Sequence, residues 1–146
     1  MSDIYHRGRL LDHVHLRVSD LNAAKTFYRA VLATLGRSET GESVRHIVFD
    51  ELWIDGADDS GVSRVHLAFQ APDRDAVDRF HAAGLNMGGT DNGKPGERIY
   101  HPGYYAAFLH DPDGHNIEAV YHGPVKRNVE SVELSVDISN DKTVVT

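Results

Sequence analysis

The chain has 146 residues, no cysteine and a formal net charge of −7, and ten of its residues are histidines. This length fits one domain that buries its own core, while the lack of cysteine excludes disulfides, thiolate zinc sites and thiol nucleophiles. The acidic balance disfavours nucleic-acid binding. No apolar run reaches the roughly 20 residues of a membrane span and no signal core is present, so we expect a cytoplasmic protein without membrane contact.

A weak internal repeat organises the chain. The segment HVHLRVSDLNAAKTFY, from His13, aligns without a gap with HLAFQAPDRDAVDRFH, from His66, at a shift of 53 residues (13 to 66). At this shift Asp20 meets Asp73 and Phe27 meets Phe80. The repeat predicts two copies of one supersecondary unit within a single domain of residues 1–146, with module one at about 10–61 and module two at about 62–124.

Each copy is expected to begin with a strand and continue into a helix. Apolar residues alternate with polar ones over residues 13–18 and 64–69, which is the pattern of a strand with one buried face. Asp20 and Asp73 then stand where helix N-caps are expected, and apolar residues follow at the spacing of a buried stripe. The helices should therefore cover the apolar faces of their strands.

Shorter β-type runs follow each predicted helix. They are RHIVF and ELWID in the first copy, and YAAFLH and NIEAVYH in the second, where the turn Asp111-Pro-Asp-Gly114 predicts a hairpin. Residues 88–103 are rich in Gly and Pro, so we expect no regular element there but a mobile flap, or else a plain connector, that brings Arg98, Tyr100 and His101 to a pocket. The alternating tail predicts a late strand at about 129–139, with a frayed terminus as the alternative.

Three side chains have the pattern of an open metal site. His13 and His66 lie on the polar faces of the two repeated strands, and Glu118 lies between apolar neighbours, where an ionised carboxylate needs compensation. Two imidazoles and a carboxylate hold a divalent metal and leave positions open for substrate. The alternative is that these histidines only face solvent. His15 shares the face of His13 and is the candidate proton acceptor, or simply a residue that lines the pocket.

Several segments together resemble the vicinal oxygen chelate superfamily, which includes glyoxalase I, extradiol dioxygenases, fosfomycin-resistance thiol transferases and bleomycin-resistance binding proteins. They are HVHLRVSDL from His13, Phe27-Tyr28, His66 and DPDGHNIE up to Glu118. The resemblance covers about residues 10–122. It implies an α+β fold in which two βαβββ modules form an open, incomplete β-barrel around a groove. It also implies His13, His66 and Glu118 as ligands of Fe²⁺, Mn²⁺, Co²⁺, Ni²⁺ or Zn²⁺.

The chain departs from this family at two places. Glyoxalase I has a fourth carboxylate ligand on the last strand of its first module, where this chain offers Glu51 or Asp55, or only Trp53 in the pocket wall. Extradiol dioxygenases and fosfomycin-resistance enzymes have a tyrosine ten residues before the metal glutamate, where this chain has Phe108. Tyr104 or Tyr105 is expected to replace its hydroxyl.

Two functions follow from the resemblance. The first is a metal-dependent lyase, dioxygenase or thiol transferase, in which the metal acts as a Lewis acid on a small oxygen-chelating substrate. Arg17 matches the glyoxalase I arginine that faces the glutathione carboxylate. The alternative is a non-catalytic, drug-sequestering protein with an aromatic cleft of Trp53, Phe108, Tyr104 and Tyr105. In either case the partner is a small molecule, and the groove is built within one chain or across a possible homodimer.

Overall fold

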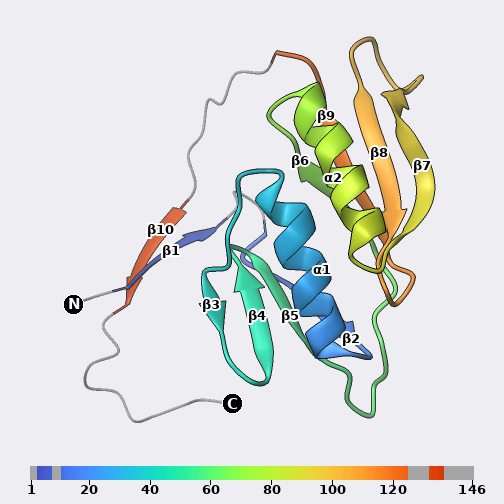
Figure 1. Cartoon of the computed structure of the whole chain (residues 1–146). Helices are drawn as coiled ribbons and strands as arrows, with labels where there is room; N and C mark the ends of the chain where they lie inside the picture. Colours follow the sequence, from blue (N-terminus) through green and yellow to red (C-terminus); the bar gives the residue numbers. More distant parts are fainter. Residues whose placement is uncertain (1–2, 8–10, 125–131, 137–146) are drawn as a thin grey trace.

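The computed structural model describes residues 3–7, 11–124 and 132–136. Two mixed sheets of four strands each, both with one helix, make up the body of the molecule (Figure 1). The first module consists of β2 (Val14–Val18), α1 (Leu21–Ala33), β3 (Gly41–Glu42), β4 (His46–Phe49) and β5 (Leu52–Gly56). The second consists of β6 (His66–Gln70), α2 (Arg74–Asn86), β7 (Thr90–Glu97), β8 (Tyr105–His110) and β9 (Asn116–Tyr121).

Both sheets have the same topology. The strand orders are β2-β5-β4-β3 and β6-β9-β8-β7, so the first strand of each module pairs with its last. That pairing is parallel in both sheets, and the other pairings are antiparallel. The two βαβββ modules of the α+β fold are thus confirmed, and the sheets do not close into a barrel.

The helices show the repeat most clearly. Both have 13 residues, and Leu21 and Arg74, where they begin, stand 53 positions apart (21 to 74). The side chain of Asp20 accepts a hydrogen bond from the Ala23 amide, and Asp73 does the same for Ala76. Each cap satisfies one of the amides that the first turn of a helix leaves without a partner. Both aspartates predicted as N-caps therefore cap their helices.

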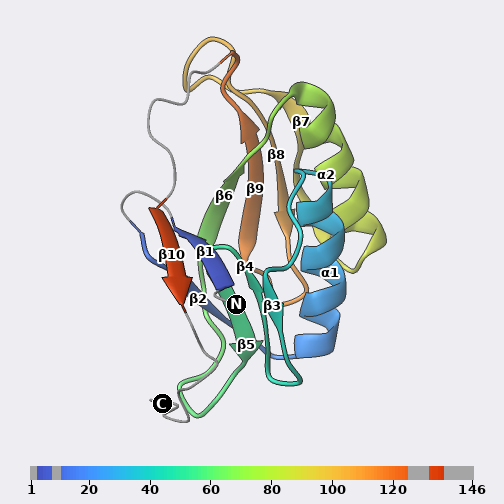
Figure 2. The same ribbon diagram turned by 90° about the vertical axis from the view of Figure 1, so that its left-hand side faces the viewer.

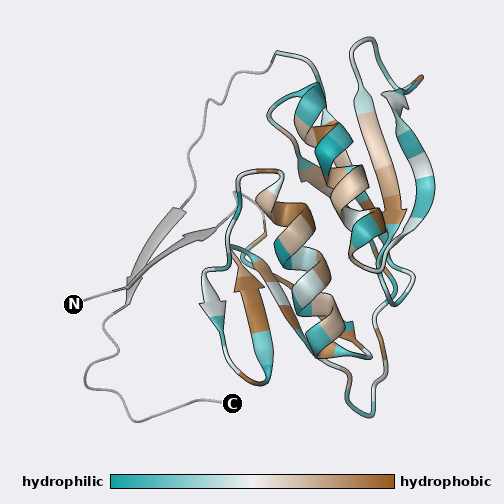
Figure 3. Cartoon of the chain, viewed as in Figure 1, coloured by the Kyte–Doolittle hydropathy of each residue, from teal (hydrophilic) through white to brown (hydrophobic). Residues whose placement is uncertain are grey.

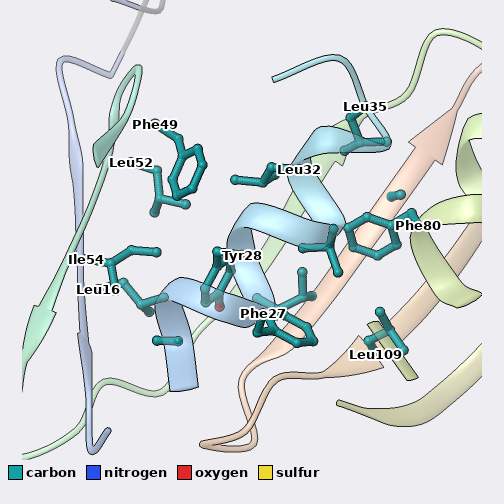
Figure 4. Close-up of a cluster of buried hydrophobic side chains, with 14 of the residues drawn as sticks. Leu16, Phe27, Tyr28, Leu32, Leu35, Phe49, Leu52, Ile54, Phe80 and Leu109 are labelled. Carbon is teal, nitrogen blue, oxygen red and sulfur yellow. The ribbon is translucent and has the colours of Figure 1, made fainter. Parts of the chain in front are cut away.

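The helices lie side by side and cover one face of each sheet (Figures 1 and 2). One cluster of buried side chains runs through both modules, and it includes Phe27 and Phe80, which are fully buried (Figure 4). α2 approaches the core so closely that a Cβ at Gly84 would lie 2.2 Å from Leu109 Cδ1. The expected burial of the apolar strand faces by the helices is confirmed.

A buried polar junction also joins the modules. The hydroxyl of Tyr28 on α1 donates to Asp111 Oδ2 at 2.7 Å, and His115 Nδ1 lies 2.7 Å from the same oxygen. Asp113 of the same turn accepts from the Ser19 amide at 3.1 Å. The turn after β8 is thereby fixed to the point where β2 leads into α1.

The segment 88–103 differs from the expectation. Half of it, residues 90–97, forms β7, an edge strand that is largely hydrophilic, whereas β4 and β8 are largely apolar (Figure 3). Its pairing with β8 is irregular around Gly93 and Gly96. An edge strand tolerates Pro95 and such irregularities because one of its sides needs no partner strand. The predicted irregular flap is wrong for residues 90–97, and only residues 98–104 connect β7 to β8.

A third, two-stranded sheet pairs β1 (Asp3–Arg7) with β10 (Val132–Val136). β10 falls within the late strand expected at about 129–139, while residues 129–131 and 137–139 lie outside the described residues. Within the described ranges, neither helix has the length and apolar character that a membrane crossing demands.

Candidate metal centre

The face of each sheet opposite the helices is open. In the second sheet, Glu118 of β9 pairs with Ala68 of β6 on one side and with Phe108 of β8 on the other. His66 begins β6, two residues from Ala68 and therefore on the same face. Tyr104 immediately precedes β8, and its side chain reaches the same place. Strand alternation thus gathers these side chains on one surface.

Glu118 is the centre of this group. Its residue surface is only 2% exposed, although its side chain is on the open face. Carboxylate oxygen Oε2 lies 2.9 Å from His66 Nε2, and Oε1 accepts a short hydrogen bond from the Tyr104 hydroxyl. In the described part of the chain, no Lys or Arg forms an ion pair with it. A carboxylate so withdrawn from water is costly without a cation beside it.

The donor pair of His66 and Glu118 fits a divalent metal. Ligand atoms that lie about 2.1 Å from a metal and at right angles are about 3.0 Å apart, close to the observed separation of 2.9 Å. Imidazole and carboxylate together suit Fe²⁺, Mn²⁺, Co²⁺, Ni²⁺ and Zn²⁺. The cation that the buried carboxylate needs can therefore be held here.

Tyr104 is a hydrogen-bond donor to this centre. Burial, the hydrogen bond to Glu118 and the negative charge of Glu118 raise the pKa of its hydroxyl to about 12. The phenol therefore keeps its proton at neutral pH. The Tyr104 hydroxyl, one of the two that the sequence offered in place of the one that Phe108 lacks, is directed at the Glu118 carboxylate.

His13 lies elsewhere in the chain. It directly precedes β2 in the first sheet, its side chain is 62% exposed, and its Nδ1 lies 2.6 Å from Asp12 Oδ1. Among residues 3–7, 11–124 and 132–136, no three His, Asp or Glu side chains come close enough to hold one metal ion. A single chain brings His66 and Glu118 together and leaves His13 apart from them.

The open face of the first sheet carries a different set of residues. His15 Nε2 lies 2.6 Å from Asp55 Oδ1, and the ring of Trp53 packs against His46 with 4.2 Å between centroids. His15 pairs with Trp53 as Ala68 pairs with Glu118 in the second sheet. Trp53 therefore stands where the second module has its carboxylate. Glu51 and Asp55 lie two positions to either side.

The predicted substrate residues are dispersed. Arg17 Nη1 lies 3.3 Å from Asp58 Oδ1 and also bonds to Ser60. The Tyr105 hydroxyl donates to Asp78 of α2 at 2.7 Å, so the Tyr105 side chain lies on the helix side of the second sheet. Tyr104 lies on the other side because adjacent strand positions face opposite ways. Since Trp53 belongs to the other sheet, the four aromatic residues do not form one cleft within a chain.

The sequence reasoning named His101 but missed His122, with which His101 forms a pair next to Tyr104. His101 Nε2 and His122 Nδ1 are 2.8 Å apart, and both rings contact that of Tyr104 edge-on. His122 is four residues after Glu118 and so has the same parity. This parity was the signal that could have found it. Arg98, which the sequence analysis did name, also lies on the open face, with its Cζ 5.4 Å from the centroid of the Phe108 ring.

Comparison with known proteins agrees with this architecture. The family model described as the Glyoxalase/Bleomycin resistance protein/Dioxygenase superfamily matches residues 10–119. The chain belongs to this superfamily. The resemblance noted in the sequence is thereby confirmed, and the superfamily contains both enzymes and binding proteins. No match was found among curated proteins.

Solved structures of the superfamily resemble the chain along most of its length. A glyoxalase/bleomycin resistance protein from Albidiferax ferrireducens T118 is 32% identical, with a TM-score of 0.68 and coverage of 76% of this chain and 98% of that one. A lactoylglutathione lyase from Agrobacterium tumefaciens is 20% identical, with a TM-score of 0.57 and coverage of 77% and 93%. A glyoxalase-related enzyme from Fulvimarina pelagi is 17% identical, with a TM-score of 0.64 and coverage of 86% and 98%. The latter two show the fold alone.

Proposed function

We propose that the protein is a metal-dependent enzyme of the glyoxalase and dioxygenase type that acts on a small oxygen-chelating substrate. The single observation that carries this proposal is the Glu118 carboxylate, which is buried on an open sheet face with His66 Nε2 2.9 Å away and no Lys or Arg ion partner in the described chain. A carboxylate at this depth needs a compensating positive charge, and a divalent metal bound together with His66 supplies it more fully than an imidazole alone. Divalent Fe, Mn, Co, Ni and Zn all suit the donor set.

The third ligand is proposed to come from a second copy of the chain. His13 is exposed on the first sheet, while His66 and Glu118 lie on the second. If the open face of module one in one protomer meets that of module two in its partner, His13 completes the site and His15 arrives beside it. A homodimer with two equivalent sites follows, because such an interface is symmetric.

Within such a site, each side chain has a separate role. A bound divalent metal would supply Lewis acidity to the substrate oxygens. Tyr104 keeps its proton, and its hydroxyl holds Glu118 Oε1, which fixes the orientation of the carboxylate. His15 is held through Nε2 by Asp55, so with its proton on that nitrogen it accepts a substrate proton at Nδ1.

Equilibrium dialysis with Zn²⁺ or Co²⁺ tests the ligand set. We expect His66→Ala and Glu118→Gln each to lower metal affinity at least about 100-fold, since each removes a direct ligand. The control is His81→Gln, because His81 lies on α2, away from the open face, and pairs there with Asp91 of β7. This variant should retain the metal affinity of the wild type. Metal affinity that is equal in wild type and His66→Ala protein would refute the proposed function.

Mixing two defective variants tests where His13 acts. His13→Ala and His66→Ala protomers are unfolded together and refolded as a mixture. If the site spans two chains, one site of each mixed dimer receives both intact histidines and regains metal binding. If the site lies within one chain, no mixed dimer regains it. Absence of recovery in a mixture shown to contain mixed dimers would therefore contradict the shared site.

A further inference from the structure

Arg98 directly follows β7 and is held in place by the backbone of that strand. Its Nη2 donates to the Lys94 carbonyl at 2.7 Å and its Nη1 to the Glu97 carbonyl at 3.3 Å. A guanidinium has five N–H donors, so these two bonds leave the others available. The side chain is half-buried, and in the described ranges no carboxylate forms an ion pair with it. It is thus a fixed positive charge without a negative partner.

Four other arginines form ion pairs, whereas Arg45, Arg64 and Arg79 form none within the described ranges. The pairs are Arg17 with Asp58, Arg29 with Glu39 and Glu42, Arg37 with Asp50, and Arg74 with Glu97. In a protein whose net charge is −7, carboxylates are abundant. Arg98 differs from the unpaired Arg45, Arg64 and Arg79 in that two backbone carbonyls hold its guanidinium in place.

Gly93 creates the space that the guanidinium occupies. Gly93 pairs with Phe108, and Phe108 pairs with Glu118, so the three residues form one row across the sheet. A Cβ at Gly93 would lie 3.0 Å from Phe108 Cδ2 and 3.3 Å from Arg98 Nη2. The arginine head group thus fills the position of a missing side chain in the row that contains the candidate metal ligand.

The row has the length of one aromatic ring with substituents at opposite ends. Neighbouring strands lie about 4.8 Å apart, so β9 and β7 are separated by about 10 Å. Phe108 lies between them, and its ring centroid is 6.0 Å from that of His66 and 5.4 Å from Arg98 Cζ. One end of the row has the candidate metal ligands His66 and Glu118, the middle is apolar, and the far end is cationic.

We propose that Arg98 binds the carboxylate of an aromatic acid whose paired oxygens, at the other end of its ring, would chelate a metal held by His66 and Glu118. The guanidinium fork matches a planar carboxylate, and its attachment to two carbonyls limits the conformational entropy that binding would cost. This inference rests on the proposed function, because it assigns the substrate class of the same site. It goes further in that the anion is recognised by a residue that is not a metal ligand.

Calorimetric titration with a matched pair of compounds tests the inference. 3,4-Dihydroxybenzoate carries the carboxylate, and 3,4-dihydroxybenzamide replaces it with a neutral group of similar shape. With Zn²⁺-loaded wild type, we expect the acid to bind about tenfold or more tightly than the amide. Arg98→Gln should abolish this preference and leave the affinity for the amide and for Zn²⁺ unchanged. The control Arg79→Gln removes an exposed arginine of α2 and should retain the preference.

Three results would overturn the inference: no preference for the acid in wild type, an undiminished preference in Arg98→Gln, or no binding of either compound. Failure of the proposed function is distinguishable, because it appears first as absent Zn²⁺ binding. In that case benzoate and benzamide are compared on metal-free protein. A benzoate preference that Arg98→Gln removes would then support the anion site alone, and its absence would reject that site as well.

Discussion

At the position where the second module has Glu118, the first module has Trp53, although both modules have the same strand order and helix length. On the helix side the two modules are equivalent, with Phe27 and Phe80 both fully buried. On the open side, each module pairs a histidine with a carboxylate, but Asp55 beside His15 is partly exposed, whereas Glu118 beside His66 is buried. The comparison teaches that the repeat is retained where the core constrains it and differs where ligands can bind.

The largest expected effects test the equivalence of the two cores. Phe27→Ala and Phe80→Ala should each lower the free energy of unfolding by about 3–5 kcal/mol, because each leaves a cavity at a fully buried position. Urea denaturation monitored by circular dichroism measures both. If one variant lost less than about 1 kcal/mol while the other lost the expected amount, the two modules would not be equivalent at this position.

The next effect concerns the junction between the modules. Burial alone would lower the pKa of His115, but its hydrogen bond to Asp111 and the charge of Asp111 raise it. Burial would likewise raise the pKa of Asp111, yet hydrogen bonds from His115 and Tyr28 lower it. The stabilisation from His115 is therefore complete below about pH 6.5 and is lost as pH rises, while that from Asp111 is lost as pH falls below about 4.

His115→Gln should accordingly cost about 3 kcal/mol between pH 4 and 6.5, and the difference from wild type should shrink above this window. Unfolding curves at pH 5, 7 and 9 measure it. A difference that grows toward pH 9 would have the wrong sign for a raised histidine pKa.

Tyr104→Phe probes the support of the carboxylate in module two. Loss of the hydroxyl that holds Glu118 Oε1 should weaken Zn²⁺ binding about tenfold, as expected for a group that orients a ligand. Tyr105→Phe is the matched control, since its hydroxyl bonds to Asp78 on the helix side. Equal Zn²⁺ affinities in the two variants would show that Tyr104 has no role in the site.

The smallest effect is expected on the open face of module one. Asp55→Asn weakens the pair with His15, which is partly exposed, so the free energy of unfolding should change by only about 0.5 kcal/mol. Thermal denaturation is sufficient to measure it. A loss above about 2 kcal/mol would show that this pair is structural and that the two open faces resemble each other more than proposed.

The sequence predicted the elements whose signals are local. The caps Asp20 and Asp73 marked both helices, alternation marked β2 and β6, and short β-type runs marked β8 and β9. β7 was missed because Gly93, Pro95 and Gly96 are poor strand formers, and its pairing with β8 depends on long-range contacts instead.

For the site, parity placed His66 and Glu118 on one face, but it could not give the relative position of two sheets that share no strand. His13 was therefore assigned to a common point that one chain does not form. Tyr105 was grouped with Tyr104 for its residue type, although adjacent strand positions face opposite sides. Arg98 was included for its place in the predicted flap, whereas its setting comes from the glycine opposite Phe108.

The position of Trp53 has an optical consequence. It is the only tryptophan of the chain, it is 37% exposed, and its indole ring packs against the imidazole of His46. Intrinsic fluorescence excited at the indole band therefore reports on the open face of module one alone. A protomer that docks there would withdraw the indole from water and shift its emission to shorter wavelength. Trp53 is thus a built-in reporter for the surface from which we propose that His13 reaches the partner's site.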